Sequence, residues 1–391
     1  MNTTILNKEV QEFINSNLKS NITQLILKGS PFKDISIQEI AEQILAKNKC
    51  EKKLPTWFTS EKIYYPNKLN IEQTSSEITA KYKSDLISGN SIIDITGGFG
   101  IDAYYFSQKF TSATHCELNE KLSKIVQHNF KQLKSTNIDC HFGDGLEFLK
   151  NSTSKFDWIY ADPSRRNNFK GKVFLLEDCL PNIPKNLELL FSKTDNILLK
   201  ISPMLDISSA IHELNFVKEV HIVAIKNEVK ELLFILEKNY TQQINIKTVN
   251  FNKSQVQKLD FNFQNESSAT YSEPKKYLFE PNSAILKAGA FQQISTQLNI
   301  DKLHQHSHLY TSNNFIEFPG RSFKIKHVIF YNKKELAKLI PSKKANITTR
   351  NFPETVAQIR KKTNLKEGGN IYLFFTTDLN NKHLVIICEK V

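Results

Sequence analysis

The sequence predicts an α/β protein built around a parallel sheet with helices on both faces, preceded by a helical lobe and followed by an α+β region. Apolar residues have helical spacing in the first 70 residues, whereas short apolar runs alternate with amphipathic stretches from residue 91 onward. Beyond residue 280, strand and helix patterns alternate again. Such alternations are typical of sheets covered by helices, and they predict more than one domain.

The N-terminal lobe is predicted from residues 7–20 and 34–49, in which apolar residues recur three and four positions apart. Either Asp34 or Ser36 would cap the second of these helices. We expect the lobe to end near residues 54–58.

The central domain is predicted from five short apolar runs separated by helical candidates. Residues 216–239 follow them as two β-rich runs around Asn227 and Glu228, which predicts an antiparallel hairpin. The sequence therefore indicates a parallel sheet that ends in a hairpin. The five predicted strands are residues 91–96, 112–117, 138–142, 156–162 and 196–202.

The C-terminal part begins with a polar stretch, residues 240–275, which is interpreted as a connecting segment. Residues 281–295 are predicted to form a helix. A small α+β domain follows, with elements predicted at residues 324–331, 333–340, 345–350, 353–363, 371–377 and 384–389.

Composition excludes several classes of protein. The first residues lack the pattern of a secretory leader, and no apolar run approaches the roughly 18 residues of a membrane span, so we expect a cytoplasmic protein with no membrane partner. The five cysteines are scattered, without a CxxC pair, which indicates reduced thiols.

The net charge of +12 is unevenly distributed. Residues 241–391 contain 22 Lys and Arg against 11 Asp and Glu, whereas residues 1–240 contain 30 against 29. A basic region attached to a neutral one is the electrostatic footprint of a polyanion-binding module. The alternative is a chain generally rich in Lys, Asn and Ile, whose basic surface has no function.

A glycine-rich turn is predicted between the first strand and its helix, in "IDITGGFGID" (residues 93–102). Gly97, Gly98 and Gly100 would let backbone N–H groups approach a ligand. Gly98, Gly100 and Ala103, with Glu117 at the end of the next strand, also match the dinucleotide fingerprint. A nicotinamide enzyme is therefore one alternative.

Two acids favour a methyl donor instead. Asp94 ends the first strand, where S-adenosylmethionine sites typically have an acid that organises the methionine end. Asp144, in "FGDGLEF" after the third strand, would face the adenine amino group. With Asp162-Pro163 after the fourth strand, the order of these elements resembles that of class I methyltransferases.

The stretch "YADPSRRN" (residues 160–167) marks the predicted acceptor side. Asp162 and Pro163 resemble the (Asp/Asn)-Pro-Pro-(aromatic) motif of amino-methyltransferases, whose acid and proline carbonyl accept hydrogen bonds from the target nitrogen. Ser164 replaces the second proline and Arg165 replaces the aromatic residue. Arg165 and Arg166 would either stack on a base or bind phosphate, or form ion pairs with Glu177 or Asp178.

Other candidates have two interpretations each. Lys200 and Asn227 would reach the substrate or serve turn geometry, and Ser75, Ser76 and Glu77 would cap a helix or contact the methionine carboxylate. Cys179 is the nearby candidate for a pyrimidine-methylating nucleophile, although its surroundings match no motif. Three alternate histidines would lie on one face of a strand, as a basic face rather than a zinc site: His304, His306 and His308.

From about residue 70 to the C-terminus, the chain resembles bacterial class I S-adenosylmethionine-dependent methyltransferases that carry a C-terminal THUMP-like domain. The matching stretches are "SSEITAKYK", "DITGGFGID", "DPSRR", "KISPMLD", "NEVKELL", "YLFEPNSAILKAGAF", "TTRNFP" and "GGNIYLFFTT".

The resemblance implies a Rossmann-like, seven-stranded methyltransferase domain at residues 71–240 after a helical lobe at residues 1–70. A linker and a small ferredoxin-like segment would follow at residues 241–320, and an RNA-binding THUMP-like domain at residues 321–391. Asp94, Gly98, Gly100, Glu117 and Asp144 would hold S-adenosylmethionine, and Asp162 with the Pro163 carbonyl would face the acceptor. The implied phosphate contacts are Lys343, Lys344, Arg350, Arg360, Lys361 and Lys362.

The leading hypothesis is an RNA methyltransferase acting on a base amine of structured RNA such as tRNA. A methyltransferase with a protein or small-molecule acceptor, and an RNA-binding protein with a relic methyltransferase fold, are the alternatives that remain open.

Overall fold

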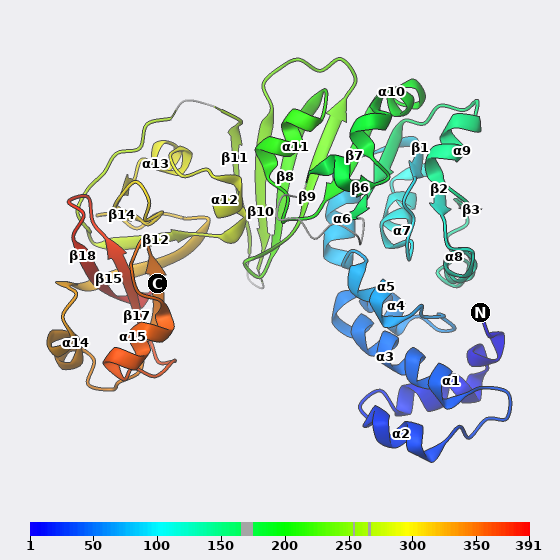
Figure 1. Cartoon of the computed structure of the whole chain (residues 1–391), viewed down its shortest axis with the longest axis horizontal. Helices are drawn as coiled ribbons and strands as arrows, with labels where there is room; N and C mark the ends of the chain where they lie inside the picture. Colours follow the sequence, from blue (N-terminus) through cyan, green and yellow to red (C-terminus); the bar gives the residue numbers. More distant parts are fainter. Residues whose placement is uncertain (166–174, 253–254, 265–266) are drawn as a thin grey trace. The chain divides into compact units, whose positions relative to one another are not determined.

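The computed structural model of the chain describes residues 1–165, 175–252, 255–264 and 267–391. They form two compact units (Figure 1): Met1–Lys218 with Leu233–Thr241, and Glu219–Leu232 with Gln242–Val391. The division passes through two adjacent strands, β8 (Val217–Ile225) and β9 (Glu228–Glu237), so each contributes residues to both units. Among the described residues, none belongs to a helix long and apolar enough to cross a membrane.

The first unit begins with the predicted helical lobe. Ser36, rather than Asp34, caps α3, because its hydroxyl and the Glu39 carboxylate form a reciprocal capping box. Trp57 and Ile71 lie in one hydrophobic cluster with Phe99, so the second half of the lobe shares a core with the glycine-turn region. The helices of the lobe are α1 (Lys8–Ser16), α2 (Ile22–Lys28), α3 (Ile37–Lys53), α4 (Pro55–Thr59), α5 (Lys68–Gln73) and α6 (Glu77–Leu86), after a 3-10 turn at Thr3–Leu6.

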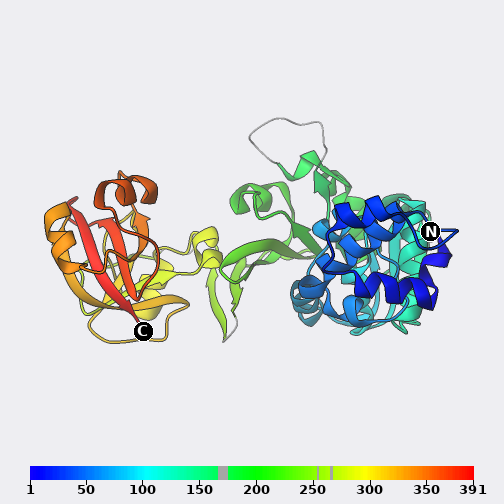
Figure 2. The ribbon, with the colours of Figure 1, turned by 90° about the horizontal axis from the view of Figure 1, so that it is seen from below.

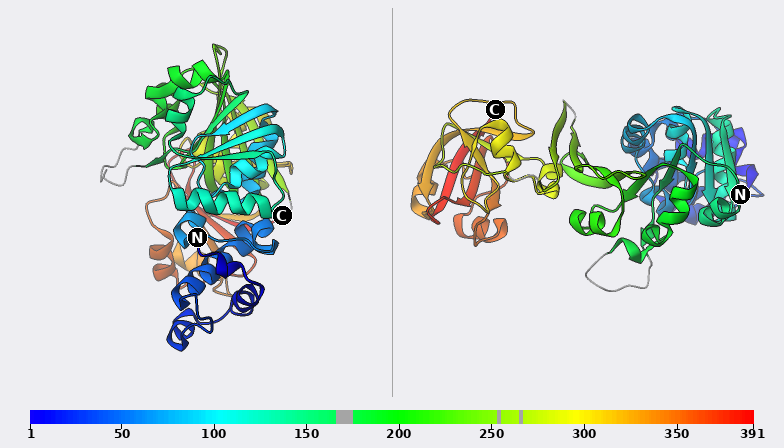
Figure 3. Two further views of the ribbon diagram at one scale, coloured as in Figure 1. Left: turned by 90° about the vertical axis from the view of Figure 1, so that its right-hand side faces the viewer. Right: turned by 90° about the horizontal axis from the view of Figure 1, so that it is seen from above.

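An open sheet forms the centre of the first unit (Figure 3, left). The parallel strands are β1 (Gly89–Asp94), β2 (Phe110–Glu117), β3 (Ile138–Phe142), β4 (Trp158–Ala161) and β7 (Asn196–Ile201). With β8 and β9 the strand order is β8-β9-β7-β4-β1-β2-β3. The connecting helices are α7 (Ile101–Ser107), α8 (Glu120–Gln132), α9 (Gly145–Asn151), α10 (Ile183–Lys193) and α11 (Ile207–Glu213).

This order reverses between β1 and β4, which creates the switch point where open α/β sheets bind ligands. The predicted hairpin turn is present: Lys226 and Asn227 separate β8 from β9, and both have positive φ, as a tight type I′ turn requires. A two-stranded ribbon of β5 (Ser164–Arg165) and β6 (Cys179–Leu180) follows β4 and precedes α10, with a 3-10 turn at Leu176–Asp178.

The second unit contains a seven-stranded sheet of order β13-β14-β12-β15-β18-β17-β16. Leu336 and Ile359 of two helices, α14 and α15, pack with Phe375 on one face of this sheet, and Phe374 packs with Leu303 in a cluster on the other face. Figure 2 shows α14 and α15 in orange beside the red strands. The elements are β12 (Tyr277–Pro281), α12 (Ser283–Ala288), α13 (Gln293–Leu298), β13 (Asp301–Lys302), β14 (Tyr310–Ser312), β15 (Gly320–Phe330), α14 (Lys333–Leu339), β16 (Asn346–Arg350), α15 (Val356–Thr363), β17 (Ile371–Thr377) and β18 (His383–Lys390).

Three local predictions are wrong. The expected connecting segment at residues 240–275 contains two strands, β10 (Asn245–Phe251) and β11 (Val256–Asn262); β10 pairs in parallel with β8, and β11 alternates exposed and buried residues along its length. The expected helix at residues 281–295 is interrupted at Gly289, whose φ of +71° ends α12. The predicted domain boundaries at residues 70, 240 and 320 remain predictions.

The third wrong prediction is that the three histidines share one face of a strand. They lie in the turn between β13 and β14 instead. His304 is buried and bonded to Asn351 and Asn381, His306 is exposed, and His308 stacks on Phe291. They therefore share no common face. Among the described residues, no group of His, Cys, Asp and Glu side chains is arranged to hold a metal ion.

Candidate active site

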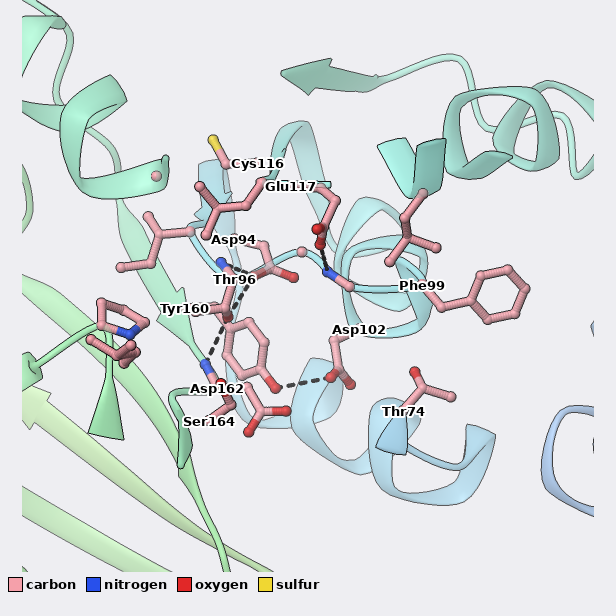
Figure 4. A pocket seen from close by; sticks show the side chains of 18 of the residues that line it. Thr74, Asp94, Thr96, Phe99, Asp102, Cys116, Glu117, Tyr160, Asp162 and Ser164 are labelled. Carbon is pink, nitrogen blue, oxygen red and sulfur yellow. Dashed lines mark hydrogen bonds between the residues drawn. The ribbon is translucent and has the colours of Figure 1, made fainter. Parts of the chain in front are cut away.

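A cavity of about 690 Å³ lies at the carboxyl ends of the first unit's strands (Figure 4). Asp94, Glu117, Asp144 and Asp162, which end or follow four different strands, all line it. The α5–α6 segment contributes Asn70, Gln73, Thr74 and Ser75. The structure thus brings the four sequence-predicted acids together, because the carboxyl ends of parallel strands meet at one edge of the sheet.

The glycine turn is built as the sequence predicts. Gly98 donates its N–H to Oε2 of Glu117 at 2.8 Å, which joins the ends of the first two strands. Gly100 has φ +76°, a left-handed conformation that favours glycine, and a Cβ there would lie 2.6 Å from the Phe130 ring. At Gly97 a Cβ would lie 2.5 Å from both the His115 ring and the Cys116 carbonyl oxygen, so its lack of a side chain serves packing on β2.

Asp94 is 2% exposed and accepts hydrogen bonds at Oδ1 from the N–H (2.9 Å) and hydroxyl (3.1 Å) of Thr96. Burial, together with the negative charges of Asp102 and Asp162, raises the pKa of Asp94 to about 8 and outweighs the Thr96 hydrogen bonds, which lower it. Thr96 in turn accepts the backbone N–H of Asp162 at 2.8 Å, so its hydroxyl connects the ends of β1 and β4.

Glu117 and Asp144 form the part of the cavity beyond the glycine turn. Oε1 of Glu117 accepts the N–H of Asn119 at 2.7 Å, and burial raises the Glu117 pKa against these backbone hydrogen bonds. Asp144 caps α9 by accepting the N–H of Leu146 at 2.7 Å. A Cβ on Gly145 would meet the backbone of Ile95 at 2.4 Å, so glycine lets the third acid approach the end of β1 closely.

Asp162 and Lys200 form an ion pair across the ends of β4 and β7. The Lys200 side chain is largely buried, whereas the Asp162 side chain is 35% exposed and faces the cavity. Pro163, the next residue, is buried. The sequence placed both charged residues near the acceptor, but only the structure shows that they contact each other.

The β5–β6 ribbon forms the wall beside Asp162. Ser164 and Leu180 are opposite each other in this ribbon, and both line the cavity, where Leu180 is half exposed. Arg165 is the next residue of β5, paired through its backbone with the buried Cys179. The ribbon therefore presents an apolar side chain, Leu180, to the cavity beside Asp162. The predicted Arg166 lies outside the described residues.

Sequence reasoning missed Asp102, in the first turn of α7, although it ends the quoted glycine motif. Its Oδ2 accepts the hydroxyls of Ser75 (2.8 Å) and Tyr160 (2.9 Å), and its Oδ1 lies 3.2 Å from Nζ of the fully buried Lys83. Burial alone would raise the pKa of Asp102, but the charges of Lys83 and Lys200 with these hydrogen bonds lower it. A polar residue among buried Ile101 and Ala103 was the available signal.

Ser76 and Glu77, predicted either to cap a helix or to contact the methionine carboxylate, both form bonds within the protein. Ser76 caps α6 by accepting the N–H of Thr79, while the Glu77 carboxylate binds Thr56 and the hydroxyl of Tyr105. These bonds join the helical lobe to α7.

The remaining predicted residues do not line this cavity. Oδ1 of Asn227 accepts the N–H of Ser283 at the start of α12, a turn and capping role. Arg350 contacts the buried Glu280 at 2.9 Å, and the Arg360 guanidinium donates to two backbone carbonyls. Lys343, Lys344 and Lys361 are exposed on the second unit, and Lys362 pairs with Glu354.

The sheet and the cavity together are characteristic of one class of protein. Seven strands in the order β3-β2-β1-β4-β7-β9-β8, with acids after successive strands at the switch point, form the Rossmann-like sheet of class I methyltransferases. A solved structure described as a "putative methyltransferase" from Porphyromonas gingivalis W83 is 30% identical across 100% of this chain and 99% of its own, with a TM-score of 0.89.

Family models match the C-terminal part: a ferredoxin-like domain at residues 277–319 and a THUMP domain-like model at residues 320–390. The chain therefore belongs to the family of methyltransferase-fold proteins with a C-terminal THUMP-like domain, as the sequence motifs predict.

Two further solved structures are similar over the methyltransferase part. TrmK of M. capricolum, in complex with S-adenosyl-homocysteine, is 20% identical over 41% of this chain and 68% of its own, with a TM-score of 0.31. A protein of Streptococcus mutans, also described as a methyltransferase candidate and solved with the same compound, is 13% identical over 41% of this chain and 96% of its own, with a TM-score of 0.31. A comparison with curated proteins found no match.

Proposed function

We propose that the protein is an S-adenosylmethionine-dependent methyltransferase that acts on a base amine of structured RNA. The charge of the cavity carries the cofactor assignment. Five carboxylates line it, and no Lys or Arg does so among the residues that the structure describes. S-adenosylmethionine has a net positive charge, whereas the pyrophosphate of a nicotinamide dinucleotide would meet like charges at low dielectric. The lining acids therefore favour the methyl donor.

The cavity residues suit the parts of this cofactor. Glu117 would accept hydrogen bonds from the ribose hydroxyls, and Asp144 from the adenine amino group. Gly98 lines the cavity and leaves room for close approach of the ligand, whereas Gly100 makes room for the packed Phe130 ring. When bound, the cofactor supplies an electrophilic methyl group on its sulfonium; the chain's own task is to orient both reactants and exclude water.

On the acceptor side, Asp162 and the Pro163 carbonyl would accept hydrogen bonds from a target N–H, which aims the nitrogen lone pair toward the methyl group. Lys200 keeps the Asp162 carboxylate oriented until the acceptor arrives. Leu180, half exposed on the cavity wall, offers an apolar contact for a base.

The RNA part of the proposal is supported by exposed lysines on the second unit. Lys366 donates its N–H to the carbonyl of Lys343 at 2.9 Å, and Lys344 forms a backbone bridge with Lys366, so three exposed lysines gather at one place. No salt bridge occupies them within the described ranges. Such clusters bind phosphate groups through counterion release. Arg350 and Arg360, in contrast, are engaged within the domain.

Isothermal titration calorimetry with S-adenosylhomocysteine and with NAD tests the cofactor assignment. We expect the first to bind and the second not to; the opposite result would exclude a methyltransferase. Mass spectrometry of nucleosides from a deletion strain then tests the acceptor, since one methylated base should disappear from its RNA.

Two alternatives give different outcomes. Labelled methyl groups that appear in protein or small molecules of a cell extract, and not in RNA, would identify another acceptor. If Asp162→Ala leaves the cellular role unchanged, the methyltransferase fold is a relic in an RNA-binding protein.

A further inference from the structure

Asp102 is a cavity-lining carboxylate to which the sequence motifs assign no role. It is 8% exposed, and it lies in Figure 4 between Tyr160 and Thr74. Ser75 and Tyr160 hold its Oδ2. Its buried Oδ1 lies beside the ammonium of Lys83 but accepts no hydrogen bond from the described residues. Oδ1 is thus stabilised by charge at 3.2 Å but keeps its capacity to accept a hydrogen bond, so it is suited to a ligand that supplies a donor.

The charges around Asp102 are unequal in number. Asp94, Asp102 and Asp162 interact with one another or with shared lysines, and the two lysines are Lys83 and Lys200. With all three acids ionised, three carboxylates would face two ammonium groups in a poorly solvated cavity, an excess that protonation of Asp94 near neutrality relieves. A bound positive charge would balance the cluster with all three acids ionised.

The other lining acids are less suited to supply the acceptor. Glu117 and Asp144 bind backbone N–H groups, and Asp162 is paired with Lys200. Asp94 is occupied at Oδ1 by Thr96, and its raised pKa of about 8 leaves it largely protonated near neutrality. Lys83 and its neighbours keep Asp102 ionised and fix its orientation.

Building on the proposed function, we infer that Asp102 binds the α-ammonium group of the methyl donor's amino-acid end. This ammonium would donate a hydrogen bond to Oδ1 and supply a positive charge that balances the cluster. Asp94, at the neighbouring strand end, would then act through charge rather than as the main ligand. The cofactor's amino-acid end would therefore lie beside Ser75 and Thr74, under the α5–α6 segment.

Two ligands separate this role from a structural one. S-adenosylhomocysteine has the α-ammonium group, whereas 5′-methylthioadenosine has the same adenosine and sulfur but no amino-acid end. In calorimetry, Asp102→Asn should weaken S-adenosylhomocysteine about ten- to hundredfold, the range for a hydrogen bond between charged groups, and change methylthioadenosine by less than about twofold. Asp144→Asn is the matched control and should weaken both ligands alike.

Since Asp102→Asn leaves the buried Lys83 without its carboxylate, the double variant Lys83→Met/Asp102→Asn is measured beside it. Its binding of methylthioadenosine reports an intact cavity. Equal losses of affinity for both ligands, or no loss of affinity for S-adenosylhomocysteine, would overturn the role of Asp102 and leave the cofactor assignment standing. If the wild-type protein binds neither ligand, the cofactor assignment itself fails.

Discussion

Replacing Asp94 with asparagine should remove a pH dependence from the stability of the first unit. Burial raises the pKa of Asp94 from 3.8 to about 8, so the folded chain binds a proton there that the unfolded chain has released. Between these two values the folded state holds more protons than the unfolded state. The free energy of unfolding of the wild type therefore falls as pH rises through this window and becomes level above about pH 8.

The size of the effect follows from linkage. Each pH unit inside the window lowers the free energy of unfolding by about 1.4 kcal/mol, and the decrease becomes smaller as Asp94 itself ionises near pH 8. From pH 6 to pH 8 the free energy of unfolding therefore falls by about 2 kcal/mol. Asparagine keeps an Oδ1 acceptor for Thr96 but cannot ionise. The stability of Asp94→Asn relative to wild type should therefore increase by this amount over the interval.

Urea unfolding followed by tryptophan fluorescence measures the difference. The two tryptophans, Trp57 and Trp158, both lie in the first unit, so the signal reports the unit that contains Asp94. Asp85→Asn removes an exposed carboxylate from the same unit, and its stability difference should change much less. An Asp94→Asn difference that is equal at pH 6 and pH 8 would refute the argument that burial keeps this acid protonated.

Three further outcomes are expected. Binding of S-adenosylhomocysteine near pH 7 should release part of a proton from Asp94, seen as a calorimetric enthalpy that varies with the buffer; Asp94→Asn should abolish this release, and a release that persists in the variant contradicts its source. Asp162→Asn should lower methyl transfer to RNA from a deletion strain about a hundredfold and leave S-adenosylhomocysteine affinity unchanged, whereas a loss of affinity would place Asp162 in the cofactor site. The double change Lys344→Gln/Lys366→Gln should lower the salt slope of RNA binding by about 0.7 for each phosphate that the lysines no longer neutralise, while Arg350→Gln should mainly reduce the stability of the second unit; an unchanged slope would exclude this lysine cluster.

Much of the fold follows from local pattern. Each of the five short apolar runs after residue 90 forms a strand. The continuous apolar segments of β1, β4 and β7 are buried, as expected for central strands of a parallel sheet. The same reasoning fails for β10 and β11. Their many polar residues gave this segment the composition of a linker. In the structure some of these residues are buried within the sheet, where Asn250 and Gln257 form a hydrogen bond with each other.

The candidate site divides in the same way. Asp94, Glu117, Asp144 and Asp162 could be predicted because strand direction alone brings the ends of parallel strands to one edge. Asp102 could not, since its role depends on side chains from three other segments.

The sheet, the glycine turn, the acids along one edge and the basic C-terminal region could all be predicted from the amino-acid sequence, because apolar periodicity and turn residues act over a few neighbouring positions. Which charges meet depends instead on tertiary packing: Lys200 pairs with Asp162, 38 residues away, and Arg350 pairs with Glu280, 70 residues away. Such pairs depend on how separate elements pack in space, and no local pattern records the distance between two side chains that the chain brings together only on folding.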